Sequence, residues 1–169
     1  MTLSGFAVTE EPNISSEKAQ EISIEFAKRV GFGELVTTWL EVKDNIAYIN
    51  LAPTQEGVVL YPDLVKVKVD MFSQRVIGFE AKNYAFNHVE RSFETSITSE
   101  DAEKELGFDY IILNTRKAII ALENDIEVPV YEFACERIGG LYYYYVDANT
   151  GRLVEILKVV DSNGTPLLV

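Results

Sequence analysis

The sequence repeats itself, and this repeat limits the possible folds more than any other feature. ISSEKA at residues 14–19 returns as ITSEDA at residues 97–102, an offset of 83 residues. Farther along, VKVKVDMFSQRVIGFE at residues 65–80 aligns with YYYYVDANTGRLVEIL at residues 142–157, an offset of only 77 residues. The chain is therefore predicted to contain two copies of one structural unit. The first copy is longer before its final hairpin, and the extra residues are expected around Pro53–Gly57.

Each copy begins with the pattern of a helix N-terminus. Ser15 and Thr98 suit the N-cap position, where a side-chain oxygen accepts a hydrogen bond from a free backbone N–H. Acidic residues follow in the first turn, where negative charge stabilises the positive end of the helix dipole. Gly31 and Gly107 are expected to end the two helices, of which the second is shorter.

Strand patterns follow each helix. TTWLEV and IAYINL flank the turn Lys43–Asn45 and predict a hairpin, and further strands are expected within residues 110–122 and 130–136. Each copy is thus a helix followed by an antiparallel sheet that buries one face against it, which is an α+β fold. The predicted organisation is an N-terminal extension (1–13), unit 1 (14–82), a connector (83–96) and unit 2 (97–169).

Four consecutive tyrosines allow two interpretations, a stacking platform for a ligand or the two faces of one strand. In the first copy, the residues aligned with Tyr142 and Tyr144 are valines, and they alternate with lysines. Side chains alternate between the two faces of a strand. Tyr142 and Tyr144 are therefore expected in the core, and Tyr143 and Tyr145 on the outward face.

The segment DANTG, residues 147–151, is expected to be a tight hairpin turn in which Asn149 and Gly151 adopt positive φ. It also resembles the start of a calcium-binding loop. An EF-hand loop, however, needs Gly at its sixth position and Glu at its twelfth, whereas Gly151 is at the fifth and Lys158 at the twelfth. The turn is the preferred interpretation, and no metal site is predicted.

Composition restricts the classes of function. The chain has 15 Lys and Arg against 27 Asp and Glu, a net charge of −12. Such a surface repels phosphate backbones and anionic lipid, so neither nucleic acid nor a membrane is an expected partner. No apolar run approaches the ~20 residues that span a bilayer, and the first residues lack the basic region of a signal peptide. The single cysteine, Cys135, shares strand parity with Phe133 and is expected to be a small buried hydrophobe.

No catalytic residue and no cofactor are predicted. Ser15–Lys18 matches the S-x-x-K motif of penicillin-binding enzymes, but the accompanying S-D-N and K-T-G motifs are absent from the sequence. His88 is the only histidine, and no spacing pairs it with Cys135 or a serine as a nucleophile. The 27 acidic residues do not single out the pair that a glycosidase requires.

A family resemblance rests on several of these motifs. The helix start S-x-E-x-A and the hairpin V-D-A-N-T-G-R-L resemble the PepSY domain. Residues 56–91, and AKNYAFNHVER at 81–91 most specifically, resemble the C-terminal tandem PepSY region of the spore germination protein YpeB family. The closing LVEILKVVDSNGTPLLV is also similar, so the resemblance covers the chain from about Asn13 to its end. The first copy departs at Met71–Gln74, where MFSQ replaces ANTG.

The resemblance implies a non-enzymatic protein of endospore-forming bacteria that acts with a cortex-lytic enzyme of the SleB type. Family members carry an N-terminal membrane segment and an upstream domain. The implied location is the spore, on the outer side of the inner membrane and in the cortex, with this portion itself soluble. The leading hypothesis is a module that binds, stabilises or restrains the enzyme. The alternatives are a peptidase-inhibitory module, as in protease propeptides, and a peptidoglycan-binding module that uses Trp39, Tyr143 and Tyr145.

Candidate contact residues lie in two places. On the connector, the candidate partner-binding residues are Tyr84, Asn87, His88 and Arg91. The alternative for the histidine is that its ring packs or caps between the two units. On the final hairpin the candidates are Tyr143 and Tyr145, because exposed aromatic residues are enriched in interfaces. Their alternative role is cross-strand pairing on an exposed sheet face. Strand addition to a sheet edge is a physical route to binding.

Overall fold

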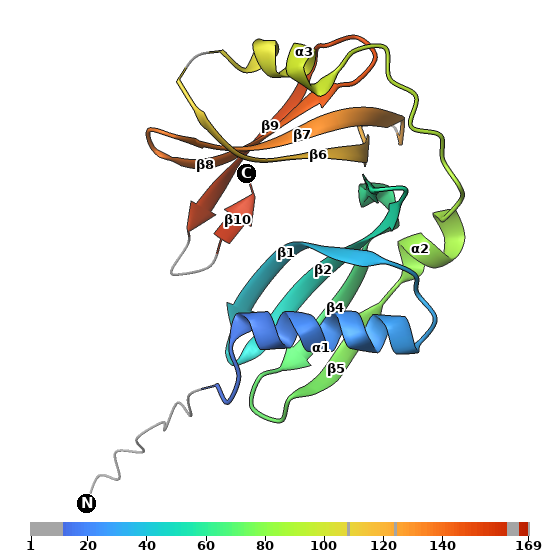
Figure 1. Cartoon of the computed structure of the whole chain (residues 1–169). Helices are drawn as coiled ribbons and strands as arrows, with labels where there is room; N and C mark the ends of the chain where they lie inside the picture. The colour runs from blue at the N-terminus through green and yellow to red at the C-terminus, as the bar shows by residue number, and fades with distance from the viewer. Residues whose placement is uncertain (1–11, 108, 124, 162–165, 169) are drawn as a thin grey trace, which may run out of the picture.

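The computed structural model consists of two stacked units, and in each of them a helix packs on an antiparallel sheet (Figure 1). The structure describes residues 12–107, 109–123, 125–161 and 166–168. Unit 1 contains α1 (Ser16–Arg29), β1 (Leu35–Lys43), β2 (Ile46–Gln55), β3 (Val58–Leu60), the 3₁₀ helix η1 (Tyr61–Asp63), β4 (Val65–Asp70) and β5 (Arg75–Glu80). After the connector helix α2 (Lys82–Asn87), unit 2 contains α3 (Ser99–Glu103), the 3₁₀ helix η2 (Lys104–Leu106), β6 (Ile111–Ala121), β7 (Glu127–Arg137), β8 (Gly140–Asp147), β9 (Leu153–Asp161) and β10 (Pro166–Leu168). The predicted α+β class is confirmed.

The helix ends follow the sequence pattern. The side chain of Ser15 accepts a hydrogen bond from the backbone N–H of Lys18 at 3.3 Å, and that of Thr98 accepts one from Asp101 at 3.2 Å. Gly31 lies just beyond the end of α1 with φ +103°. Both predicted N-caps are therefore confirmed. Among the described residues, no helix is long and apolar enough to span a bilayer.

The alternation of side chains along the strands is also confirmed. In β4, Val65, Val67 and Val69 are at most 1% exposed beneath α1, whereas the lysines between them are exposed. In unit 2, Tyr144 is buried in the core that forms against α3, together with Cys135. Burial raises the pKa of the Cys135 thiol to about 11, so at neutral pH it stays protonated. The cysteine is a core residue, as predicted.

The final turns of the two units have the same construction. Asp70 accepts hydrogen bonds from the backbone N–H groups two and three residues later, at 2.9 and 3.3 Å, and Asp147 accepts the equivalent pair at 2.7 and 3.0 Å. The positive φ falls on Gln74 in the first turn (+58°) and on Gly151 in the second (+72°). The predicted positive φ of Asn149 is wrong, because its N–H instead bonds to the aspartate.

Substitutions in these two turns test how much a side chain costs at a residue whose backbone has positive φ. Gln74→Gly is expected to raise the free energy of unfolding by about 0.5–1 kcal/mol, because it removes a Cβ from a conformation that suits glycine. Gly151→Ala is expected to lower it by about 1 kcal/mol or more, and its Cβ would lie only 3.4 Å from Ile97 Cδ1. Urea unfolding of both variants measures the two changes. A loss of stability in Gln74→Gly would contradict a strained, positive-φ backbone at this residue.

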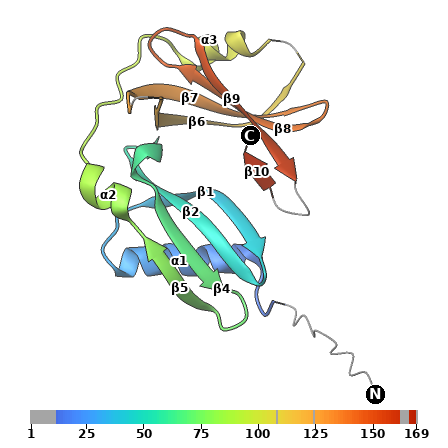
Figure 2. The same cartoon turned by 180° about the vertical axis from the view of Figure 1, so that it is seen from behind.

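The extra residues of unit 1 join the two units. They begin at the end of the predicted Pro53–Gly57 segment and form β3 and η1, whereas β7 and β8 of unit 2 are joined by a tight turn. β3 is antiparallel to the end of β2 and parallel to β6, with Val59 opposite Ala118. The strands form one ten-stranded sheet in the order β10-β9-β8-β7-β6-β3-β2-β4-β5, with β1 also paired to β2. Figure 2 shows β3 and η1 reaching from unit 1 toward unit 2.

Candidate functional site at the junction of the two units

A buried ion network holds the connector against both units. Asp63 of η1 is fully buried, and Nη1 and Nη2 of Arg91 donate hydrogen bonds to its carboxylate at 2.6 and 3.0 Å. The same guanidinium donates through Nε and Nη2 to Glu127 of β7 at 2.6 and 2.7 Å. The hydrogen bonds to Glu127 raise the pKa of Arg91, whose side chain is only 7% exposed. Arg91 thus links η1 of unit 1 to β7 of unit 2 through two bidentate pairs.

The rest of the connector is attached to unit 1. The side-chain amide of Gln55 exchanges two hydrogen bonds with the backbone of Arg91, at 2.6 and 3.0 Å. Nδ1 of His88 lies 2.8 Å from Oδ2 of Asp63, and its ring stacks on Tyr84 with centroids 4.2 Å apart. Tyr84 in turn packs on the unit 1 core beside Phe32. The histidine ring therefore does pack, but against unit 1 and the connector, and not between the two units as the sequence alternative had it.

A second polar network lies on the other side of η1. The hydroxyl of Tyr61 donates a hydrogen bond to the carboxylate of Glu132, a residue that is 1% exposed. Nε of Arg116 donates a hydrogen bond to the same carboxylate at 2.6 Å. Arg116 also donates to the Tyr61 hydroxyl at 3.1 Å. Burial and the neighbouring Glu132 carboxylate raise the pKa of Tyr61, so its hydroxyl remains a donor. Two residues of η1, Tyr61 and Asp63, thus enter separate networks with unit 2 and the connector.

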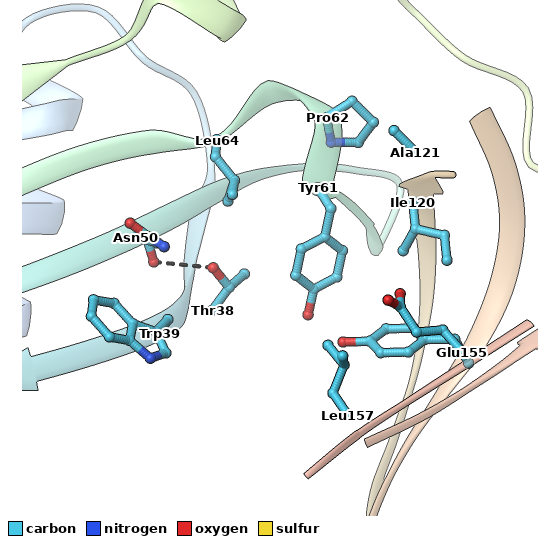
Figure 3. Close-up of a pocket in the computed structure, with 11 residues that line it drawn as sticks. Thr38, Trp39, Asn50, Tyr61, Pro62, Leu64, Ile120, Ala121, Glu155 and Leu157 are labelled. Atoms are coloured by element: carbon cyan, nitrogen blue, oxygen red, sulfur yellow. Dashed lines mark hydrogen bonds between the residues drawn. The ribbon is translucent and has the colours of Figure 1, made fainter. Parts of the chain in front are cut away.

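A crevice between the units lies beside these networks. Its volume is about 490 Å³, and its walls come from β1, β2 and η1 of unit 1 and from β6, β8 and β9 of unit 2. Figure 3 shows the hydroxyl end of Tyr61 pointing toward the side where Glu155 and Leu157 lie. Thr38 donates to the backbone oxygen of Asn50 at 3.3 Å across the opposite wall. The crevice therefore combines aromatic and apolar surface with one carboxylate.

Two of the six candidate contact residues are not available at the surface. Tyr145 does point away from the unit 2 core, but it is only 3% exposed because unit 1 covers that face of the sheet. The expectation that Tyr145 is exposed is therefore wrong. Arg91 is likewise enclosed by its two carboxylate partners and cannot offer its guanidinium to a second protein. The prediction that Arg91 is a partner contact is therefore wrong, and the connector surface does not include it.

The other four candidates are at least partly accessible. Asn87 is exposed on α2, the side chain of His88 is 32% exposed, and Tyr84 is half-buried. Tyr143 is half-buried and lines a hollow of about 350 Å³ between β1 and the β8–β9 hairpin. Their roles as partner contacts remain predictions.

Sequence reasoning missed the most exposed apolar residues of the connector. Phe86 is 79% exposed and Val89 is 58% exposed. A signal for Phe86 was present, because Tyr84 and His88 have the i, i+4 spacing of one helix face, which places Phe86 between them on the opposite face. Val89 follows the end of α2, so no helical spacing assigns it to a face. The inward face of the AKNYAFNHVER segment anchors the connector, and the outward face presents two apolar side chains.

Two family models match the chain. The family model described as "YpeB sporulation, PepSY1 and PepSY2 domains" matches residues 7–94, more than half of the chain. The chain belongs to the YpeB sporulation family. A second family model, "Peptidase propeptide and YPEB domain", matches residues 81–157 of this YpeB-family chain. The two matches together cover residues 7–157 and overlap on the connector.

Individual YpeB proteins are similar over nearly the same region. The sporulation protein YpeB of Halalkalibacterium halodurans is 26% identical over 90% of this chain and 34% of its own length. That of Bacillus subtilis is 26% identical over 88% of this chain and 34% of its own length. This chain therefore spans about a third of the length of these relatives.

A solved YpeB structure has the same fold. The Bacillus megaterium YpeB C-terminal domain is 30% identical and superimposes with a TM-score of 0.83, covering 90% of this chain and 68% of that one. The predicted family is confirmed. These relatives are named as sporulation proteins, which supports a role of the family in sporulation.

Proposed function

We propose that this YpeB-family chain is a non-enzymatic module that binds a cortex-lytic enzyme of the SleB type and stabilises or restrains it in the dormant spore. The observation that carries this proposal is the exposed pair Phe86 and Val89 on a connector whose other face is anchored. Large apolar side chains in a fixed position are typical of protein–protein contact sites. Asn87 lies beside them as an exposed hydrogen-bonding group.

The anchoring of the connector favours tight binding. Arg91 holds the end of this segment through charge pairs with the buried Asp63 and the partly exposed Glu127, and the ring of His88 is held between Tyr84 and Asp63. A contact surface that is already ordered loses less conformational entropy when its partner arrives. We infer that the junction of the two units serves to present the outward face of the connector.

The residues with nucleophilic or acid–base chemistry have structural roles that support a non-enzymatic function. Ser15 caps a helix, and Cys135 is buried with a raised pKa. His88 is committed to Asp63 and to the Tyr84 ring. Each of these side chains therefore already has a partner or a packing role within the fold.

Calorimetric titration of this chain against the SleB-type enzyme of the same organism tests the proposal. Phe86→Ser is expected to weaken binding by about tenfold or more, because it removes an apolar contact residue. Ile138→Ser is the matched control, because Ile138 is fully exposed in the β7–β8 turn, away from the connector. Equal affinity of the Phe86→Ser variant and the parent chain would contradict a connector interface.

A second candidate function follows from the second family model, whose description names peptidase propeptides. We propose as the alternative that the chain slows a protease in trans. Protease assays with and without the chain separate the two functions, since inhibition without affinity for the cortex-lytic enzyme would favour the alternative. Sedimentation of the chain with purified cortex, in the absence of the enzyme, would instead favour direct binding of peptidoglycan.

A further inference from the structure

We propose that the outer edge of β5 binds an extended, acidic peptide segment of a partner protein by strand addition. This edge is separate from the outward face of the connector, so the inference goes beyond the function proposed above. β5 is the last strand in the sheet order and, within the described part of the chain, pairs only with β4. Figures 1 and 2 both show β5 at the border of the unit 1 sheet. A strand at such an edge carries backbone N–H and C=O groups that a further strand can pair with.

Hollows lie on both sides of this edge. On the helix side, a hollow of about 420 Å³ is lined by apolar atoms of Ile22, Phe26 and Val76. On the opposite side of the sheet, a hollow of about 550 Å³ includes Gly78 and Lys68. Side chains of an added strand would alternate between the two sides. Successive residues of the peptide would therefore enter the two hollows in turn, which gives the site a preference for sequence as well as for backbone.

The charge of this region favours an acidic ligand. Arg29 and Arg75 line the helix-side hollow, and Lys66 and Lys68 line the other. None of these four cations forms an ion pair with another described residue. Most Lys and Arg residues of the described chain likewise lack an ion pair, so it is the gathering of four cations at one edge of a chain of net charge −12 that favours an acidic ligand. The acidic residues Glu25, Glu41 and Glu80 also line the hollows. On the side opposite the helix, Lys68 lies across from Gly78 of β5, with its Nζ 5.2 Å from the centre of the Tyr48 ring, so it is the cation that a ligand carboxylate would meet there.

Gly78 lies in the middle of the edge strand. It has no side chain, and the side-chain carbons of Lys68 lie over it, 3.1–3.3 Å from where a Cβ would be. The neighbouring Ile77 and Phe79 are 54% and 41% exposed, which leaves apolar surface uncovered along the edge. The cations also discourage pairing between two copies of the same edge, whereas an acidic strand removes that repulsion.

The ligand that fits these features is an extended segment in which apolar and acidic side chains alternate. Its apolar side chains would cover Ile22, Phe26 and Val76, and its carboxylates would pair with the lysines on the opposite side. A blocked octapeptide of alternating Glu and Val is therefore the probe. Its titration into ¹⁵N-labelled chain, followed by chemical shifts and amide hydrogen exchange, tests the proposal.

The expected result is that shifts concentrate in β4, β5 and α1, and that β5 amides exchange more slowly when the peptide is bound. Lys68→Glu and Lys66→Glu are each expected to weaken binding by about tenfold or more, and added salt is expected to weaken it further. Lys43→Glu is the matched control, because Lys43 is an exposed lysine on β1, three strands away from β5 in the unit 1 sheet. Phe86→Ser is expected to leave peptide binding unchanged, which separates this site from the connector.

Several outcomes would overturn the proposal. Shifts that avoid β5, or charge reversals that leave the affinity unchanged, would remove the edge or its cations from the site. Equal binding of an alternating Lys and Val octapeptide would rule out charge complementarity. Equal binding of a Glu and Val peptide with a central proline would rule out strand addition, because proline has no N–H for the ladder.

Discussion

Arg91→Ala is expected to lower the free energy of unfolding by about 3–5 kcal/mol. The substitution leaves the carboxylate of Asp63 fully buried with only the His88 ring nearby, and it also releases Glu127. A buried charge without its counterion costs much more than the pair itself contributes. The loss would also free the connector from β7, so faster amide hydrogen exchange is expected across residues 82–91.

Urea unfolding followed by circular dichroism measures the stability of this variant. Arg152→Ala is the matched control, since Arg152 is exposed in the final turn and its removal is expected to change stability by less than about 0.5 kcal/mol. Combining Arg91→Met with Asp63→Asn removes both charges together and is expected to cost less than the sum of the two single changes. A loss below about 1 kcal/mol in Arg91→Ala would show that Asp63 gains another partner when the guanidinium is removed.

Tyr145→Ala is expected to lower the free energy of unfolding by about 3–5 kcal/mol, the usual range for a large buried aromatic residue. The ring fills the apolar cluster between the units, where it contacts the edge of the Tyr61 ring with centroids 6.2 Å apart. Burial, and after it the Glu132 carboxylate, raise the pKa of Tyr145, so the hydroxyl stays protonated within this polar group. Removing the side chain opens a cavity at the contact between unit 1 and unit 2.

Tyr143→Ala is the comparison within the same strand. Tyr143 faces the same side of β8 but is only half-buried, so a loss of about 1–2 kcal/mol is expected. Thermal and urea unfolding of the two variants distinguish the positions. Full stability of Tyr145→Ala together with lost affinity for the partner enzyme would contradict the packing of this ring between the units. Tyr145 would then belong to a contact surface for the partner, as the sequence predicted.

Much of the local structure could be predicted because it depends on neighbouring residues. The N-caps at Ser15 and Thr98 need only a side-chain oxygen beside free backbone N–H groups. The burial of alternate residues in β4, and the division of the β8 tyrosines Tyr144 and Tyr145 between two different clusters, follow from strand geometry. Comparison of the two repeat offsets also located the extra residues of unit 1 close to where β3 begins. The motif 81–91 predicted the correct family before any comparison.

The sequence by itself therefore determined the class of fold, its duplication, the caps, the turns and the two faces of each strand. Tertiary structure alone decided which of the outward faces meets solvent. Strand periodicity assigns Tyr145 to a face, but that face is buried only because β3 pairs with β6 and brings unit 1 against it. The roles of Asp63, Arg91 and Glu127 likewise depend on contacts between residues 28 and 36 positions apart. Local patterns cannot reveal such contacts, because the free energy that selects them comes from burying surfaces and charges that are brought together only when the chain folds.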